Sequence, residues 1–179
     1  MTNRQQWTLV AGIVMTAVFG IALAIKLRPQ LGLLEVGSSK APAFHAVHLG
    51  SGKPARIEDY RGRVVLLNIW ATWCGPCIQE MPSMQRLQEK LAGTDFHIVA
   101  VSVDEEDSTV VRKFAQKLGV TFEILQDQSG SIRQIYQTSG VPENFIIDRD
   151  GTIMKHVIGA AQWDSPVQEA QIRHLLNAR

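Results

Sequence analysis

The feature that most constrains this chain is a pair of cysteines, Cys74 and Cys77, which lie between a strand pattern and a helix pattern. Residues 64–70 are apolar and β-branched enough for a buried strand, and residues 78–87 favour a helix. This order places the first sulfur at a helix N-terminus, where unpaired N–H groups and the helix dipole stabilise a thiolate. In such motifs the pKa of a cysteine falls from about 8.5 to about 3.5–7.5. We therefore expect a reactive dithiol that cycles to a disulfide.

The composition limits the chain to a few classes. Its 179 residues, 45% of them hydrophobic, suit one globular domain plus an appendage. Two cysteines within one motif exclude a structural disulfide framework. Only three of the 18 basic side chains, and none of the 17 acidic ones, lie in residues 1–28. The remainder is slightly acidic, so no basic face for nucleic acid is expected.

The N-terminal stretch predicts attachment to a membrane. Residues 5–25 carry no charge, and a helix of about 20 such residues can span a bilayer. We expect an uncleaved anchor in residues 1–28 with the N-terminus on the cytoplasmic side. This orientation places the tethered dithiol on the oxidising side of the membrane, where disulfides occur. The alternative is a cleaved signal peptide, for which residues 22–24 offer a small-x-small site. Residues 29–40 are then a linker, and residues 41–179 the folded domain.

The rest of the chain alternates strand and helix patterns, which indicates a single three-layer α/β domain with a mixed sheet. A turn precedes a segment, residues 55–60, that returns towards the central strand. An Asp-Gly turn at residues 150–151 joins the last two strands as a hairpin. The remaining strands are expected at residues 44–49, 97–103, 122–125, 144–148 and 153–158, and the remaining helices at 110–118, 131–136 and 166–176.

An acidic run at residues 104–107 is the one candidate metal site apart from the cysteines. Acids before a helix favour its dipole, and Asp107 or Ser108 can cap it, so we interpret the run as a helix start. The five histidines show no metal-ligand spacing, and a second Cys-x-x-Cys is missing. No metal site is therefore predicted.

Residues 64–77, together with Val141 and Pro142 before a strand, closely resemble the thioredoxin superfamily. More narrowly, the chain resembles the membrane-anchored TlpA/ResA/DsbE-like thiol–disulfide oxidoreductases over residues 41–176. The resemblance implies a thioredoxin-like α/β/α domain with a mixed central sheet. It also implies that the redox-active Cys74–Cys77 disulfide is sufficient and that no other cofactor is needed.

The resemblance assigns roles around the sulfurs. Cys74 is the nucleophile, and Cys77 is the more buried resolving thiol with the higher pKa. Asn68 stands where thioredoxin has a proton-carrying aspartate. Glu80, three residues after Cys77 and one helical turn away, is expected to take over the proton transfer.

The substrate-binding residues are expected on both sides of the dithiol. Trp73 shapes the site, while Gly75 and Pro76 fix the turn, and Pro76 suits the first helical position. Pro142 is expected to be cis, which brings the Val141 backbone beside the sulfurs, where it can pair with an extended peptide. Glu143 follows in the DsbE-like proline–glutamate segment.

The resulting hypothesis is a membrane-tethered extracytoplasmic thiol–disulfide oxidoreductase that acts mainly as a reductase. The Gly-Pro dipeptide favours reduction, since thioredoxin has a potential of about −270 mV and the oxidant DsbA about −120 mV. Apocytochrome c is the expected substrate, and a membrane thiol donor of the DsbD/CcdA type would regenerate the dithiol. The alternatives are a general disulfide reductase or isomerase, a copper-binding thiol chaperone using Met81 or Met84, and a peroxidase, which needs a lone nucleophile.

Overall fold

The computed structural model describes residues 12, 14–20 and 34–178. The chain divides into two compact units, Met1–Leu33 and Leu34–Arg179. Among the described residues, no helix combines the length and the apolar character that crossing a membrane requires. Most of the predicted anchor lies outside these residues, so the membrane span stays a prediction.

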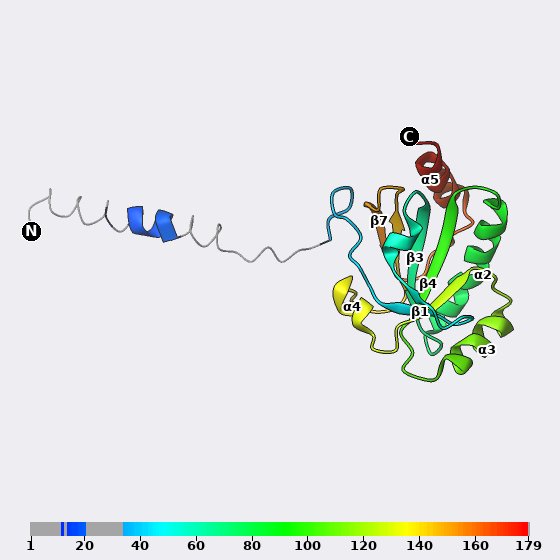
Figure 1. Cartoon of the computed structure of the whole chain (residues 1–179). Helices are drawn as coiled ribbons and strands as arrows, with labels where there is room; N and C mark the ends of the chain where they lie inside the picture. The colour runs from blue at the N-terminus through cyan, green and yellow to red at the C-terminus, as the bar shows by residue number, and fades with distance from the viewer. Residues whose placement is uncertain (1–11, 13, 21–33, 179) are drawn as a thin grey trace, which may run out of the picture. The chain divides into compact units, whose positions relative to one another are not determined.

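The second unit is built on one seven-stranded sheet with the order β2-β1-β5-β4-β3-β6-β7 (Figure 1). The three central strands β5, β4 and β3 run parallel, whereas β1 and β2 at one edge and β6 and β7 at the other pair antiparallel. The mixed sheet expected from the sequence is thereby confirmed. The strands are β1 (Ala46–His48), β2 (Pro54–Ala55), β3 (Val64–Trp70), β4 (Phe96–Ser102), β5 (Glu123–Gln126), β6 (Glu143–Ile147) and β7 (Ile153–Ile158).

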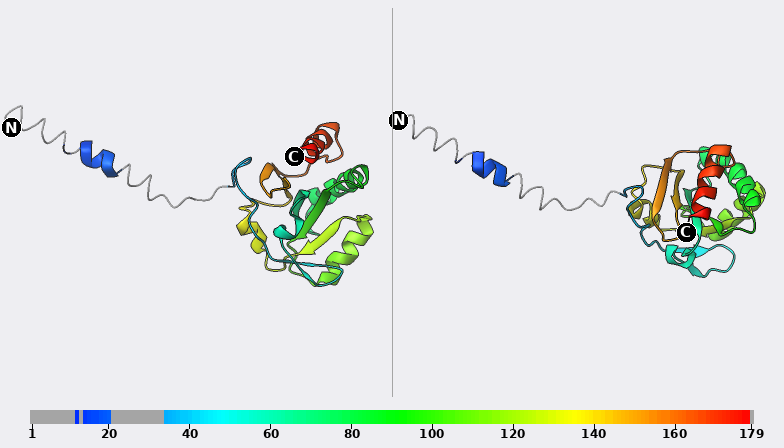
Figure 2. Two further views of the ribbon diagram at one scale, coloured as in Figure 1. Left: turned by 45° about the horizontal axis from the view of Figure 1, so that its top comes forward. Right: turned by 90° about the horizontal axis from the view of Figure 1, so that it is seen from above.

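Helices cover the sheet unequally. The long helix α2 (Gly75–Lys90), α3 (Ser108–Leu118) and α5 (Pro166–Asn177) lie together on one side, as the two views of Figure 2 show. The short α4 (Ser131–Ile135) and the 3-10 helix η1 (Ile57–Tyr60) belong to the other side (Figure 1). There Tyr136, directly after α4, contacts the rings of Phe44 and Phe145.

Strand β3 is central because neighbours pair with it on both edges and side chains cover both faces. Every one of its seven residues is buried, which explains the nearly continuous apolar run in the sequence. It pairs parallel with β4 and antiparallel with β6. Its C-terminal end runs directly into the cysteines. The strand therefore fixes the start of α2 from within the core.

Two segments differ from the sequence-based expectation. Residues 55–60 do not run on as a strand, because the Arg56 N–H donates to the Asp59 carboxylate at 2.9 Å and the chain turns into η1. The end of the predicted linker is hydrogen-bonded to the domain: the Gly37 N–H donates to the Ile153 carbonyl at 2.7 Å. Lys40 forms a β-bridge with Thr152.

Candidate active site

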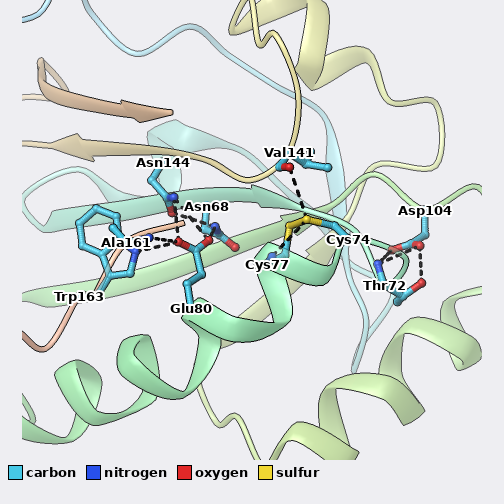
Figure 3. Close-up of a disulfide and its surroundings, with 10 residues drawn as sticks. All are labelled: Asn68, Thr72, Cys74, Cys77, Glu80, Asp104, Val141, Asn144, Ala161 and Trp163. Atoms are coloured by element: carbon cyan, nitrogen blue, oxygen red, sulfur yellow. Dashed lines mark hydrogen bonds between the residues drawn. A yellow bond between two sulfur atoms is a disulfide. The ribbon is translucent and has the colours of Figure 1, made fainter. Parts of the chain in front are cut away.

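The two cysteines lie where β3 ends and α2 begins, and they form a disulfide (Figure 3). Cys74 is the N-cap residue of α2, and the Cys77 N–H donates to its Sγ at 3.2 Å. Because α2 begins at Gly75, Pro76 is its second residue rather than its first. Cys74 is 4% exposed and Cys77 is fully buried. Cys77 is therefore closed to a partner, whereas Cys74 keeps a small exposed fraction.

Glu80 lies one turn further along α2 and points into the protein. The residue is 2% exposed. Its Oε1 accepts from the Asn68 amide at 2.8 Å, and its Oε2 accepts from the Trp163 indole at 3.2 Å and from the Ala161 N–H at 3.1 Å. The Asn144 amide lies within 3.4 Å of both oxygens. The carboxyl group is thus enclosed by neutral donors.

This enclosure changes the acidity of the group. Burial raises the pKa of Glu80 above its ordinary value, and the four donors oppose that rise without cancelling it. All four of these donors are neutral groups. A carboxyl group with a raised pKa, close to a thiol that must lose a proton, can accept that proton.

The Asn68 amide also donates to Asn144 Oδ1 at 2.8 Å, which links the two side chains below the sulfurs. The Asn68 Oδ1 atom is buried and has no hydrogen-bond partner among the described residues. Position 68 therefore supplies a donor to Glu80, and it cannot ionise. The transfer of the proton-carrying function from position 68 to position 80 stays a prediction.

Residues 139–142, here called the cis-proline turn, lie beside the disulfide. The Val141–Pro142 peptide bond is cis, as expected. The Val141 carbonyl oxygen is 3.4 Å from Cys74 Sγ (Figure 3). Within residues 34–178 the Val141 N–H has no hydrogen-bond partner. The backbone of Val141 can therefore pair with an added extended segment.

Glu143 follows the turn at the start of β6 and is only 1% exposed. Its carboxylate accepts hydrogen bonds from Ser139 and Gly140 within the turn and contacts His156 on β7 at 2.6 Å. All of these contacts are internal. The structure thus places Glu143 behind the turn, and contact with a substrate stays a prediction.

The two tryptophans near the motif have different environments. Trp73 is 64% exposed, the largest apolar side chain at this end of the domain that faces solvent. Trp70 is fully buried, with its ring centroid 6.2 Å from that of Phe114 on α3. Trp73 is therefore available to a docking partner, whereas Trp70 is part of the core.

The expectation that Asp104 belongs to a helix start is wrong. Its carboxylate is buried and accepts from the Thr72 N–H at 3.0 Å, from the Thr72 hydroxyl at 2.6 Å and from the Ser102 hydroxyl at 2.6 Å. It thereby holds the loop that carries Trp73 and Cys74. Asp107 does cap α3, as predicted, by accepting from the Thr109 N–H.

Four residues of the site were not identified from the sequence: Asp104, Asn144, His156 and Trp163. For Asp104 a signal existed, since it follows a buried strand that is parallel to β3, so both strands end at the same edge. For the other three no local pattern pointed to the cysteines.

Across residues 12, 14–20 and 34–178, no group of three or more His, Cys, Asp or Glu side chains is arranged to hold a metal ion. Met81 and Met84, the candidate extra ligands for copper, are fully buried in the hydrophobic core.

Comparison with known proteins gives the family. Residues 38–156 match the model of the AhpC/TSA family. The chain belongs to this family. The thiol-disulfide oxidoreductase ResA of Geobacillus kaustophilus (strain HTA426) is 35% identical over 147 residues, which cover 82% of this chain and 83% of that protein. The thioredoxin-like protein YneN of Bacillus subtilis (strain 168) is 38% identical over 134 residues, 74% of this chain and 76% of its own.

Solved structures agree with this assignment. The crystal structure of a putative thiol:disulfide interchange protein DsbE from Chlorobium tepidum superimposes with a TM-score of 0.73 at 33% identity, and covers 80% of this chain and 99% of that one. Within the AhpC/TSA family the chain is thus a ResA/DsbE-like thiol–disulfide oxidoreductase with a thioredoxin-like fold. The disulfide between Cys74 and Cys77 is the redox centre of such an enzyme.

Proposed function

We propose that this protein is a membrane-tethered, extracytoplasmic reductase of disulfides in partner proteins. The main support for this proposal is that the two cysteines lie between a peptide-binding backbone and a buried carboxyl group. On one side lies the unpaired Val141 backbone, and on the other the enclosed Glu80 carboxyl group. The first can hold a peptide and the second can take a proton, which are the two needs of disulfide exchange. The charge-free residues 5–25 support the tether.

In the first step the Cys74 thiolate attacks one sulfur of the partner's disulfide. A mixed disulfide forms, and the other partner sulfur leaves as a thiolate that takes a proton from solvent. Cys74 suits this step because its Sγ accepts the Cys77 N–H at the start of α2, where the helix dipole favours negative charge.

In the second step Cys77 resolves the mixed disulfide. Its thiol passes a proton to the Glu80 carboxylate and attacks Cys74 Sγ, which forms the Cys74–Cys77 disulfide seen in the structure. The second partner sulfur leaves and is protonated, so the partner has gained two electrons and two protons. Cys77 is fully buried and cannot pass its proton directly to bulk water, which makes an internal acceptor necessary.

The partner is held as an extended segment against Val141, while Trp73 offers exposed apolar surface on the other side of the sulfurs. Apocytochrome c is the proposed substrate, since the two cysteines of its haem-binding Cys-x-x-Cys-His motif can form a local disulfide. A membrane thiol donor of the DsbD/CcdA type would return electrons to Cys74 and Cys77. No cofactor besides this disulfide is needed.

The test is reduction of insulin disulfides by the reduced full-length protein, measured beside the reduction potential of its dithiol. We expect turnover by the wild type, none by Cys74→Ser, and a potential closer to about −270 mV than to about −120 mV. A strongly oxidising potential with no insulin reduction contradicts the reductase proposal. Labelling of intact cells with an impermeant thiol reagent tests the location: Cys74 should react from outside.

A further inference from the structure

The Glu143 carboxylate is divided between two groups of neighbours. Its Oε1 accepts from the Ser139 N–H at 2.6 Å, from the Ser139 hydroxyl at 2.8 Å and from the Gly140 N–H at 3.2 Å. These donors belong to the cis-proline turn. The other oxygen, Oε2, contacts His156 Nε2 at 2.6 Å. One side chain therefore connects the turn to β7.

His156 is held in place on two sides. Its ring stacks on Phe145 at a centroid distance of 4.3 Å and an interplanar angle of 9°. The two atoms are within hydrogen-bond distance, and with the hydrogen on Nε2 the imidazole donates to the carboxylate. The side chain of Glu143 is 1% exposed and that of His156 is 26% exposed.

The rest of the turn is also fixed. The Pro142 carbonyl accepts from the Gly159 N–H at 2.9 Å, and Glu143 pairs with Ile158 in the sheet. Ser139 and Gly140 precede Val141, and the Glu143 carboxylate is the acceptor for both of their N–H groups. Without it, the segment before Val141 would lose its only anchors to β6 among the described hydrogen bonds. The position of the Val141 backbone therefore depends on how Glu143 is oriented.

We propose that Glu143 and His156 are a positioning pair: His156 orients the Glu143 carboxylate, which holds the cis-proline turn so that the Val141 backbone faces a peptide substrate. The pair does not touch the sulfurs and is not catalytic. The inference rests on the proposed function, since it concerns how that reaction binds its protein substrate. It assigns to His156 a role that neither its sequence position nor its spacing indicates.

The experiment compares the wild type with His156→Leu in the reduced full-length protein, using two oxidants. Insulin must dock its backbone, whereas 2-hydroxyethyl disulfide has no peptide backbone to pair. We expect the KM for insulin to rise about tenfold in His156→Leu, which corresponds to about 1.4 kcal/mol of lost docking. The kcat for insulin and all constants for 2-hydroxyethyl disulfide should stay within about twofold of the wild type, because the sulfurs are unchanged.

Two further variants separate positioning from general damage. His156→Gln keeps a donor nitrogen near the Glu143 carboxylate and should restore most of the wild-type KM. His97→Leu is the matched control: His97 also contacts a glutamate, Glu123 at 2.8 Å, and an aromatic ring, that of Tyr60 at 5.6 Å. It lies at the opposite end of β4 from the cysteines. We expect a loss of stability similar to that of His156→Leu but no change in KM.

The positioning role of Glu143 and His156 and the proposed reductase function fail in different ways. If the wild type does not reduce insulin, the proposed function fails and the inference fails with it. If the wild type reduces insulin and His156→Leu matches it, only the positioning role is overturned. The same holds if His156→Leu slows both oxidants equally, or if His156→Gln behaves like His156→Leu.

Discussion

Glu80 and Glu143 are two glutamates buried to nearly the same degree at the same end of the domain, yet their surroundings differ. Glu80, 2% exposed, is enclosed by amide, indole and backbone N–H donors that carry no charge. Glu143, 1% exposed, accepts from the cis-proline turn and contacts an imidazole. Burial raises the pKa of Glu80, because neutral donors do not fully replace lost water. The two glutamates are equally deep and differ in the kind of partner, which is why we propose a proton acceptor at Glu80 and an anchor at Glu143.

The substitution Glu80→Gln is expected to have the largest effect, and it tests whether Glu80 differs from Glu143 as a proton acceptor. An amide cannot accept the Cys77 proton, so we expect the resolution of the mixed disulfide to slow by about 100- to 1,000-fold. Alkylation of Cys74 by iodoacetamide should remain unchanged, since that step does not involve Cys77. Stopped-flow kinetics measure the rate of resolution, and a separate assay measures the rate of Cys74 alkylation. Unchanged resolution would mean that Glu80 is structural only.

A third buried carboxylate, Asp104, extends the comparison. We expect Asp104→Asn to destabilise the protein by about 1–3 kcal/mol, because an amide nitrogen would face the donors of Thr72 and Ser102. Urea unfolding of the full-length protein measures this. Asp107→Asn is the matched control from the same acidic run, and it should change little, since asparagine is as good an N-cap as aspartate. Equal effects of the two substitutions would contradict the anchoring role of Asp104.

Trp163→Phe removes one neutral donor from Glu80 and leaves the others. Since that hydrogen bond lowers the pKa of Glu80, its loss should raise the pKa further. The pH at which resolution is half-maximal should move upward with it. Trp73→Phe, at an exposed indole outside this enclosure, should leave that midpoint in place. A downward shift in Trp163→Phe would refute the neutral-donor explanation.

The smallest effect concerns stability against pH. The pKa of Glu80 is raised in the folded protein, so folding favours its protonated form. This contribution is fully present below the unfolded pKa and is lost as the pH rises through the folded pKa. Across that window the wild type should lose stability relative to Glu80→Gln, by at most about 1.4 kcal/mol per pH unit. Urea unfolding of both proteins at several pH values measures the difference, and parallel curves would contradict it.

The cysteine motif, the buried strand β3 and the start of α2 were readable from the sequence because each depends on neighbouring residues. A strand pattern followed by a helix pattern fixes where a sulfur lies relative to a helix end, whatever the rest of the fold does. The hairpin of β6 and β7 was predicted for the same reason, since an Asp-Gly turn acts locally. The cis peptide bond and the proton-accepting role of Glu80 came from family resemblance, not from the local pattern.

The environment of Glu80 could not be read in this way. Trp163 lies 83 residues from Glu80 in the chain, and Asn144 lies 64 residues from it. Asp104 reaches Thr72 across 32 residues. The sequence alone determined that a reactive dithiol exists at a helix start. Only tertiary structure decided that Glu80 keeps a raised pKa, because its donors Asn144, Ala161 and Trp163 lie on segments that are far away in the chain. It also decided that the Glu143 carboxylate meets His156 on the neighbouring strand β7.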